Sequence, residues 1–441
     1  MSIARCRPTP ARAARSVAGW SSIFAIGAVV LALASAGVAQ TARRAANVLY
    51  IISNDARTNM NSILAYRRGS DGNLTPLPGS PFLTNGTGQA NLEDVVGPLD
   101  SDQDLIVNRQ RTLLFATNRG SNTIAVFRIA RDGSLTHVPG SPFPSGGINP
   151  VSVGLSRNIL VVVNKNDDDA QLPNNSQPNY TTFRVRPSGE LVPIANSTVS
   201  IPADSAPTQA LISPSGTLLF GAELALRLHP QNGPALGNPA LRAFRITRRG
   251  RLIQAPGSPV TLPNSLPNAL PPLPPLPPAP LGLAIHPRLP VLYSGVVTSD
   301  RVAAYSYNIA TGQLVFRNAA TLGGRAPCWL EINRRGTRLY SANTLTTSVS
   351  VFDLANATDP VQIQHLTLNG PGELINLTLD PTERLLYVLS RRNNTGFPLP
   401  NAANQVHVLQ VGPDGKLTEA PFSPITLPAG TTYTPQGIVA I

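Results

Sequence analysis

A short unit recurs along almost the whole sequence. In its clearest copy, residues 113–143, the apolar run LLFAT is followed by polar turn residues and then by the alternating segment TIAVFRI. A third apolar segment follows the turn at Asp132-Gly133. Alternating residues bounded by Gly, Asn and Asp are typical of half-buried antiparallel strands. Because one such unit cannot bury both of its faces, the copies must pack against one another.

The copies can be counted from one anchor position, which is an aromatic or apolar residue inside a short apolar segment. The anchors are Tyr50, Phe115, Val161, Phe220, Tyr293, Tyr340 and Tyr387. Seven units, each with about four strands, predict an all-β fold, a seven-bladed β-propeller of four-stranded antiparallel blades. The longer units contain insertions, among them the Pro-rich residues 263–280 in the fourth.

A further predicted strand precedes each anchor after the first and should be the innermost strand of its blade. These segments are residues 101–108, 150–155, 208–213, 282–286, 328–333 and 373–380. The chain then enters the ring at the second strand of the first blade, so that blade lacks an inner strand. We expect residues 436–441 to supply it, closing the ring without an open sheet edge.

The N-terminal residues 1–39 have the composition of a secretory signal peptide. A basic segment, residues 1–15, precedes the apolar residues 23–34, and small residues occupy positions 37 and 39. We expect cleavage after Ala39 and a secreted or periplasmic protein. An uncleaved membrane anchor is the alternative, because residues 17–39 are nearly long enough to span a bilayer. Apart from such an anchor, no membrane contact is expected.

The remaining chain divides into a linker, residues 40–45, and the propeller, residues 46–441. The net charge is +12, but the Arg residues are scattered and no basic run alternates with aromatic residues, which argues against nucleic-acid binding. No two of the five His residues have metal-ligand spacing, so we predict neither a metal nor a cofactor. Cys328 would be the single mature cysteine and is expected to be buried. We expect a monomer.

The repeats resemble those of a known family. Segments of the form LYSAN…SVSVFDL, from Leu339, and LLFATN…TIAVFRI…DGSL, from Leu113, are joined by G-x-x-P before the inner strand. They resemble the lactonase-family seven-bladed propellers, which include 6-phosphogluconolactonases of the propeller type, and they are similar to YVTN-type repeat proteins. The resemblance covers residues 46–441 and implies a lactonase-like carboxylic ester hydrolase.

The family's enzymes carry G-P-R-H before one inner strand and N-E-L at the end of the next strand. The matching segment here reads APTQALISPSGTLLFGAEL, so that Glu223 fits the acidic position. Thr208 and Gln209 stand where the family has Arg and His, which removes a general acid or base and an anion contact. The resemblance implies Glu223 as the catalytic candidate, with a structural role as the alternative.

Two other groups are candidates for ligand binding. Asp100, Asp102 and Asp104 alternate, so a strand would place all three on one face, toward the axial channel and a ligand or cation. The alternative is a set of solvated loop carboxylates, since Leu105 replaces the Gly of a calcium loop. Arg325, just before an inner strand, is placed to contact an anion at the face where ligands enter, unless it is an ordinary loop residue.

Two functions remain open at this point. The first is an exported lactonase-like enzyme that hydrolyses a sugar lactone or a related cyclic ester. The second is a non-catalytic scaffold whose loops on one face bind a small molecule, a glycan, a cell-wall polymer or a protein. The residues at positions 208 and 209 favour the scaffold, and the resemblance favours the lactonase.

Overall fold

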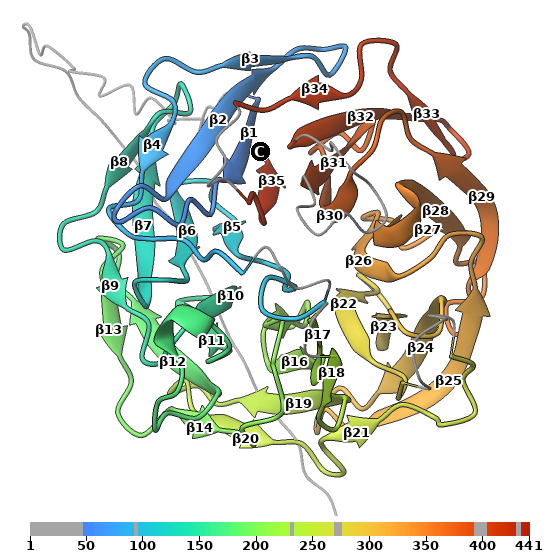
Figure 1. Ribbon diagram of the computed structural model, residues 1–441, viewed down its shortest axis with the longest axis horizontal. Coiled ribbons are helices and arrows are strands. Elements are labelled where there is room, and N and C mark those ends of the chain that lie inside the picture. The colour runs from blue at the N-terminus through green and yellow to red at the C-terminus, as the bar shows by residue number, and fades with distance from the viewer. Residues whose placement is uncertain (1–46, 92–95, 230–232, 269–275, 392–403, 429–433) are drawn as a thin grey trace, which may run out of the picture. The chain divides into compact units, whose positions relative to one another are not determined.

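The computed structural model describes residues 47–91, 96–229, 233–268, 276–391, 404–428 and 434–441. Within these residues the strands form seven antiparallel blades around a central axis, together with one separate two-stranded hairpin (Figure 1). The predicted seven-bladed β-propeller is therefore confirmed. The expected signal peptide, the linker and the middle of the Pro-rich insertion lie outside the described residues. No described helix is long and apolar enough to cross a membrane.

The first four blades follow the chain in order, except that blade 1 also contains the last strand. Blade 1 contains β1 (Val48–Ile52), β2 (Ser62–Arg68), β3 (Leu74–Pro76), β4 (Phe82–Leu83) and β35 (Ile438–Ala440). Blade 2 contains β5 (Leu105–Val107), β6 (Leu113–Asn118), β7 (Thr123–Ile129), β8 (Leu135–His137) and β9 (Phe143–Pro144). Blade 3 contains β10 (Pro150–Ser156), β11 (Ile159–Asn164), β12 (Asn179–Val185), β13 (Leu191–Pro193) and β14 (Val199–Ser200). Blade 4 contains β15 (Leu211–Ile212), β16 (Leu218–Glu223), β19 (Ala240–Ile246), β20 (Leu252–Gln254) and β21 (Val260–Thr261).

The last three blades complete the ring. Blade 5 contains β22 (Pro280–Ile285), β23 (Val291–Val296), β24 (Arg301–Tyr307) and β25 (Leu314–Thr321). Blade 6 contains β26 (Pro327–Ile332), β27 (Arg338–Asn343), β28 (Ser348–Asp353) and β29 (Val361–Thr367). Blade 7 contains β30 (Glu373–Leu379), β31 (Leu385–Arg391), β32 (Gln405–Val411), β33 (Leu417–Glu419) and β34 (Ile425–Thr426). Outside the blades lie the hairpin of β17 (Leu226–His229) and β18 (Gly233–Leu236) and the short 3-10 helices η1 (Asp169–Gln171) and η2 (Thr344–Thr346).

The seven anchor residues occupy one register. Each lies in the second strand of its blade and pairs with a residue of the inner strand. In blade order, these inner partners are Val439, Ile106, Gly154, Leu211, Ala284, Glu331 and Thr378. The same sequence position thus has the same structural role in all seven blades.

The inner strand of blade 1 comes from the far end of the described chain. β35 pairs antiparallel with β1, with Tyr50 opposite Val439 and Ile51 opposite Ile438. Arg68, at the end of β2, donates a 2.7 Å hydrogen bond to the carbonyl of Ile441. Both edges of β1 are therefore paired, as a closed ring requires.

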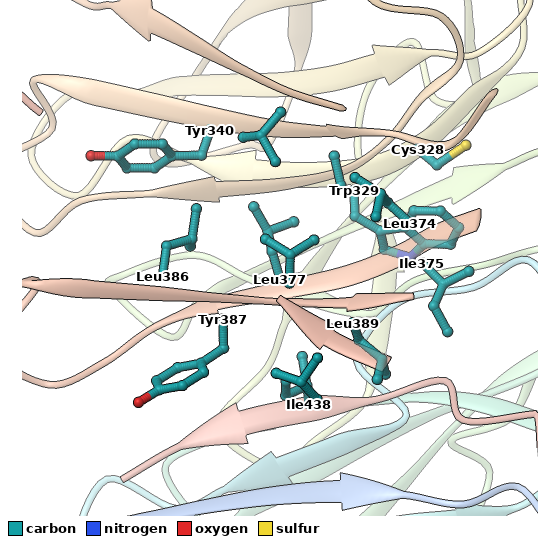
Figure 2. Packing of buried hydrophobic residues seen from close by; sticks show 14 of the residues in the cluster. Cys328, Trp329, Tyr340, Leu374, Ile375, Leu377, Leu386, Tyr387, Leu389 and Ile438 are labelled. Atoms are coloured by element: carbon teal, nitrogen blue, oxygen red, sulfur yellow. The ribbon is translucent and has the colours of Figure 1, made fainter. Parts of the chain in front are cut away.

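The core lies between neighbouring sheets. Figure 2 shows Leu386 and Tyr387 of β31 on opposite sides of their sheet, Leu386 toward Tyr340 of blade 6 and Tyr387 beside Ile438 of blade 1. The hydroxyls of Tyr50, Tyr340 and Tyr387 each donate to the carbonyl of a turn glycine, Gly133, Gly415 and Gly72 respectively, in the next blade around the ring. Strand alternation therefore lets each sheet contact both neighbours.

The inner strands define two faces of the ring. They begin at what we call the upper face and end at the lower face. The long connections 84–104, 165–178 and 224–239 all join strand ends at the upper face, because they adjoin the first residues of β5 and the paired ends of β11 with β12 and β16 with β19. The lower face carries short turns, such as residues 157–158 and 286–290.

Two inner strands are shorter than predicted. Residues 101–104 do not join β5, because the backbone NH of Asp102 donates to the carbonyl of Thr208 in blade 4 instead of to β6. In blade 4 the ladder is interrupted at Ala210, whose NH donates to the side chain of Ser152. In both places the backbone NH bonds to another blade, Asp102 to blade 4 and Ala210 to blade 3, instead of pairing within its own blade.

Candidate functional site

A pocket of about 380 Å³ follows the axis of the propeller. Its walls come from the inner strands of blades 1, 2, 4, 5, 6 and 7, with apolar residues such as Leu105, Leu211 and Leu283. Pro214 and Pro287, which follow the lower ends of β15 and β22, also line it, so the pocket extends toward the lower face. Its polar lining residues are Asp102, Gln103, Gln209, Glu331, Asn376 and Thr378.

Residues 97–104, which we call the axial segment, lie at the upper end of this pocket. Three side chains from different blades hold its backbone. Lys165 donates to the carbonyls of Gly97, Pro98 and Asp100, at 2.5, 3.4 and 3.2 Å. Arg119 donates to the Leu99 carbonyl at 3.1 Å, and the Trp329 indole donates to the Ser101 carbonyl at 2.9 Å. The segment is therefore held at the upper end of the pocket by three blades.

The carboxylates above the pocket are neutralised by buried cations. Arg119 contacts Asp104 at 2.6 Å, and both side chains are about 1% exposed. Arg391 lies 2.9 Å from Glu373 and 3.5 Å from Asp100. Such buried charges require partners, because an unpaired charge away from water is strongly destabilising.

Asp102 has a different environment, since its partners are neutral. Its Oδ2 accepts from the Gln209 amide at 3.1 Å, and its Oδ1 accepts from the Gln103 backbone NH at 2.7 Å and from the Asn376 amide at 3.2 Å. Burial raises the pKa of Asp102 to about 7, although these hydrogen bonds lower it. Asp102 is thus held in place as a carboxyl group that titrates near neutrality.

Glu331 is the second carboxyl group of the pocket. It lies in β26 opposite Tyr340, and burial together with the charge of Asp102 raises its pKa to about 8. Within the described residues neither Glu331 nor Asp102 forms an ion pair. Sequence reasoning missed Glu331, although a carboxyl group inside the predicted inner strand Cys328-Trp329-Leu330-Glu331-Ile332 was a usable signal.

The prediction that Asp100, Asp102 and Asp104 share one face is wrong. They precede β5 in irregular backbone, and only Asp102 lines the pocket. Asp104 turns to Arg119, which follows β6 of the same blade, and Asp100 turns to Arg391 at the end of β31 in blade 7. The alternative of solvated loop carboxylates is also wrong, because all three residues are buried.

Glu223 lies at the end of β16, beside Pro207, as the resemblance implies. Its carboxylate forms a two-point ion pair with Arg242 of β19, one contact being 3.0 Å, and it does not line the axial pocket. Burial raises the pKa of Glu223, while Arg242 opposes that shift. Thr208 is buried and donates to the Ala222 carbonyl, whereas Gln209 faces the axial pocket and positions Asp102.

Arg325 lies in the connection between β25 and β26 at the upper face. Its Nε is 3.7 Å from Asp300, and its side chain is 41% exposed. Glu223, Arg325 and Asp102 therefore have separate surroundings, and only Asp102 reaches the axial pocket. Among the described residues, no group of three or more His, Cys, Asp or Glu side chains is arranged to hold a metal ion.

Comparison with known proteins agrees with this architecture. Residues 277–421, in blades 5 to 7, match the family model described as lactonase, 7-bladed β-propeller. The periplasmic gluconolactonase of Pseudomonas aeruginosa superposes with a TM-score of 0.63 at 15% identity, covering 90% of this chain and 99% of that one. A Bacteroides uniformis protein with the provisional name 6-phosphogluconolactonase superposes with a TM-score of 0.63 at 14% identity, again covering 90% and 99%. No curated protein matches the chain.

These findings confirm the resemblance to the lactonase-family seven-bladed propellers. The family match covers the last three blades, and the structural likeness extends over the ring. At such low identity the structural likeness establishes the fold.

Proposed function

We propose that the protein hydrolyses a sugar lactone or a related cyclic ester in the axial pocket. One observation carries this proposal: the pocket contains two carboxyl groups, Asp102 and Glu331, whose pKa values are raised to about 7 and about 8. Hydrolysis of an ester near neutral pH needs a base that is partly ionised and an acid that is still protonated. Apolar inner-strand residues around these groups would contact the carbon faces of a ring.

In the proposed reaction the ionised carboxylate of Asp102 accepts a proton from a water molecule as its oxygen attacks the lactone carbonyl. The tetrahedral intermediate then collapses, and the bond between the carbonyl carbon and the ring oxygen breaks. Protonated Glu331 donates a proton to the departing ring oxygen, which becomes a hydroxyl group. In the product hydroxy acid, the new carboxyl group contains the carbonyl oxygen of the lactone and the oxygen of the attacking water. Proton exchange with solvent returns Asp102 and Glu331 to their starting forms.

The amides of Gln209 and Asn376 act in this proposal as positioning groups. Gln209 donates to Asp102 and accepts a 2.7 Å hydrogen bond from the Leu283 backbone NH, so its orientation is set by blades 2 and 5. Asn376 donates to Asp102 from blade 7. Asp102 is thus oriented from both sides of the axis, which limits the reorganisation needed during reaction.

The test is hydrolysis of D-glucono-1,5-lactone by the purified protein, with the spontaneous rate subtracted. We expect Asp102→Asn and Glu331→Gln each to lower kcat/KM by about 100-fold. The matched control is Glu190→Gln, because Glu190 lies in an exposed pair with Arg186. A wild-type rate equal to the spontaneous rate would refute the proposal.

A non-catalytic binding function is the second candidate. It is favoured by the ion pair that holds Glu223, the acidic residue suggested by the resemblance, and by the long connections gathered at the upper face. Such a scaffold would bind a glycan, a cell-wall polymer or a protein there. Binding to any of these that survives Asp102→Asn, with no lactone hydrolysis by the wild type, would support this candidate.

We also propose that the protein is exported. The basic, apolar and small residues of segment 1–39 support a cleaved leader. N-terminal sequencing of protein from the periplasm or the medium should give Gln40 as the first residue. Full-length protein in the membrane fraction would instead indicate a retained anchor.

A further inference from the structure

We propose that the axial pocket selects uncharged lactones and rejects phosphorylated ones, because its described lining contains two carboxyl groups and no cationic side chain. This inference rests on the proposed function and names the substrate class of the same site. Its basis is the distribution of charge along the axis.

The cationic side chains near the axis lie above the pocket, where each already has partners. Arg119 pairs with Asp104, and Arg391 pairs with Glu373 and Asp100. The Lys165 ammonium group donates to carbonyls of the axial segment. None of these three side chains lines the pocket, and its described lining contains no Lys, Arg or His.

A phosphate group needs cations or several donors where it binds. Proteins recognise phosphate with Arg, Lys or clusters of backbone NH groups, because a dianion loses strong hydration on entering a pocket. Here the Gln209 amide already donates to the side chains of Asp102 and Gln103. The Asn376 amide already donates to Asp102 and to a backbone carbonyl. A phosphorylated lactone would therefore bring two negative charges into a pocket without a compensating group.

The pocket already disfavours the ionised forms of its own two carboxyl groups. Burial raises the pKa of both carboxyl groups, and the charge of Asp102 contributes to the raised pKa of Glu331. At short range and in a partly dehydrated site, each further anion is repelled by those already present. A neutral ring with hydroxyl groups meets no such repulsion and finds carboxyl oxygens to which it can donate.

The same distribution has a consequence for the product. Hydrolysis converts a neutral lactone into a hydroxy acid whose carboxyl group is ionised at neutral pH. The carboxylate then forms beside Asp102 and Glu331, where charge repulsion favours its departure. Substrate selection and product release thus have one physical cause.

The experiment compares kcat/KM for D-glucono-1,5-lactone and for its 6-phosphate. We expect the neutral lactone to be preferred by about 100-fold or more. We also expect Thr378→Lys, which places a cation on the pocket wall, to shift the ratio toward the phosphate by at least about tenfold. Thr367→Lys is the matched control, because Thr367 is exposed on the outer strand β29.

Each outcome separates the two proposals. Hydrolysis of both lactones with equal or greater kcat/KM for the phosphate overturns the selection and leaves lactone hydrolysis standing. If neither lactone is hydrolysed above the spontaneous rate, lactone hydrolysis fails, and calorimetry with D-glucono-1,5-lactam and its 6-phosphate decides the selection. Tighter binding of the neutral lactam then supports it. Tighter binding of the phosphate, or binding of neither, overturns it. The wild-type ratio decides the matter even if Thr378→Lys does not fold.

Discussion

Gln209 donates a 3.1 Å hydrogen bond from Nε2 to Oδ2 of Asp102, although 107 residues separate the two in sequence. This contact joins blade 4 to the axial segment and favours the charged form of the carboxyl group. By the family resemblance, Gln209 stands at a position where the related enzymes have His. The residue that departs from the family pattern is therefore a hydrogen-bond partner of the pocket carboxyl group.

The first prediction concerns this hydrogen bond. Gln209→Leu removes a donor to ionised Asp102, so the pKa of Asp102 should rise. Because the proposed reaction needs Asp102 ionised as the base, the acid limb of the pH profile of kcat/KM should move to higher pH, and kcat/KM at pH 6.5 should fall about tenfold. Gln410→Leu is the control, since Gln410 is exposed on β32. A lower rate with an unmoved acid limb would contradict the assigned role.

The second prediction is the pH dependence of the proposed lactone hydrolysis. The proposed reaction requires Asp102 ionised, with a pKa of about 7, and Glu331 protonated, with a pKa of about 8. The profile of kcat/KM should therefore be bell-shaped, with its maximum between these values. Initial rates from pH 5 to 9.5, corrected for spontaneous hydrolysis at each pH, give the two apparent pKa values of the coupled pair. A profile that rises steadily through pH 9 would exclude Glu331 as the acid.

The third prediction links Glu331 to stability. Its folded-state pKa lies above the value for an unfolded chain, so its stabilising contribution is complete below about pH 4.5 and is lost as pH rises toward 8. Across that window, Glu331→Gln should gain a few kcal/mol of unfolding free energy relative to the wild type. Urea unfolding at pH 5 and pH 9 measures the difference. Glu190→Gln should show no such change, since its side chain is 41% exposed in a pair with Arg186.

The fourth prediction concerns the ion pair of Glu223. Arg242→Met leaves a buried carboxylate without its cation and should lower the free energy of unfolding by about 3–5 kcal/mol. Adding Glu223→Gln in the same chain should restore part of that loss. If Glu223 is structural, Glu223→Gln should keep kcat/KM within about threefold of the wild type. A loss of activity in a stable Glu223→Gln protein would instead return the catalytic role to Glu223.

The fifth prediction tests the contact between the last and the first blade. Tyr387 donates a 3.2 Å hydrogen bond to the Gly72 carbonyl across the ring closure, so Tyr387→Phe should lower the free energy of unfolding by about 1 kcal/mol. Tyr305→Phe is the matched control, because in the described structure the buried hydroxyl of Tyr305 has no hydrogen-bond partner. We expect that control to be neutral or stabilising in denaturant unfolding. Equal losses in both variants would show that the Gly72 contact contributes nothing specific.

Ring closure can also be tested by truncation. Deletion of residues 434–441 removes β35, the inner partner of β1. We expect faster proteolysis of the whole propeller, because both neighbours of blade 1 lose packing. Cleavage confined to blade 1 would show that the other six blades are stable without closure.

The sequence alone was sufficient to predict the repeat architecture. Anchor residues such as Tyr50 and Tyr387 are found by counting, and the structure places all seven anchors in one register. The inner strand of blade 3 was predicted as residues 150–155 and is observed as Pro150–Ser156. Such features depend on alternation and turn residues within about fifty positions, which makes them visible without the tertiary fold.

The candidate site could be predicted only in part. Asp102 was identified as a candidate for ligand binding, but Asp100 and Asp104 were predicted to have the same role. Their directions depend on Arg119 and Arg391, whose positions around the axis no local pattern reveals. Glu331 and Asn376 were not identified, because each becomes a neighbour of Asp102 only when blades 6 and 7 close around the axial segment.

The sequence by itself thus determined the number of blades, the strand order and the register, since each follows from short-range periodicity and burial. Only the tertiary structure decided which carboxyl groups meet the pocket and which are neutralised. That decision rests on contacts between separate parts of the chain. The axial segment lies across the ring, its cations come from Arg119, Lys165 and Arg391, and among the described residues Asp102 and Glu331 form no ion pair. Charge and burial at the axis are properties of the closed ring and of no single repeat.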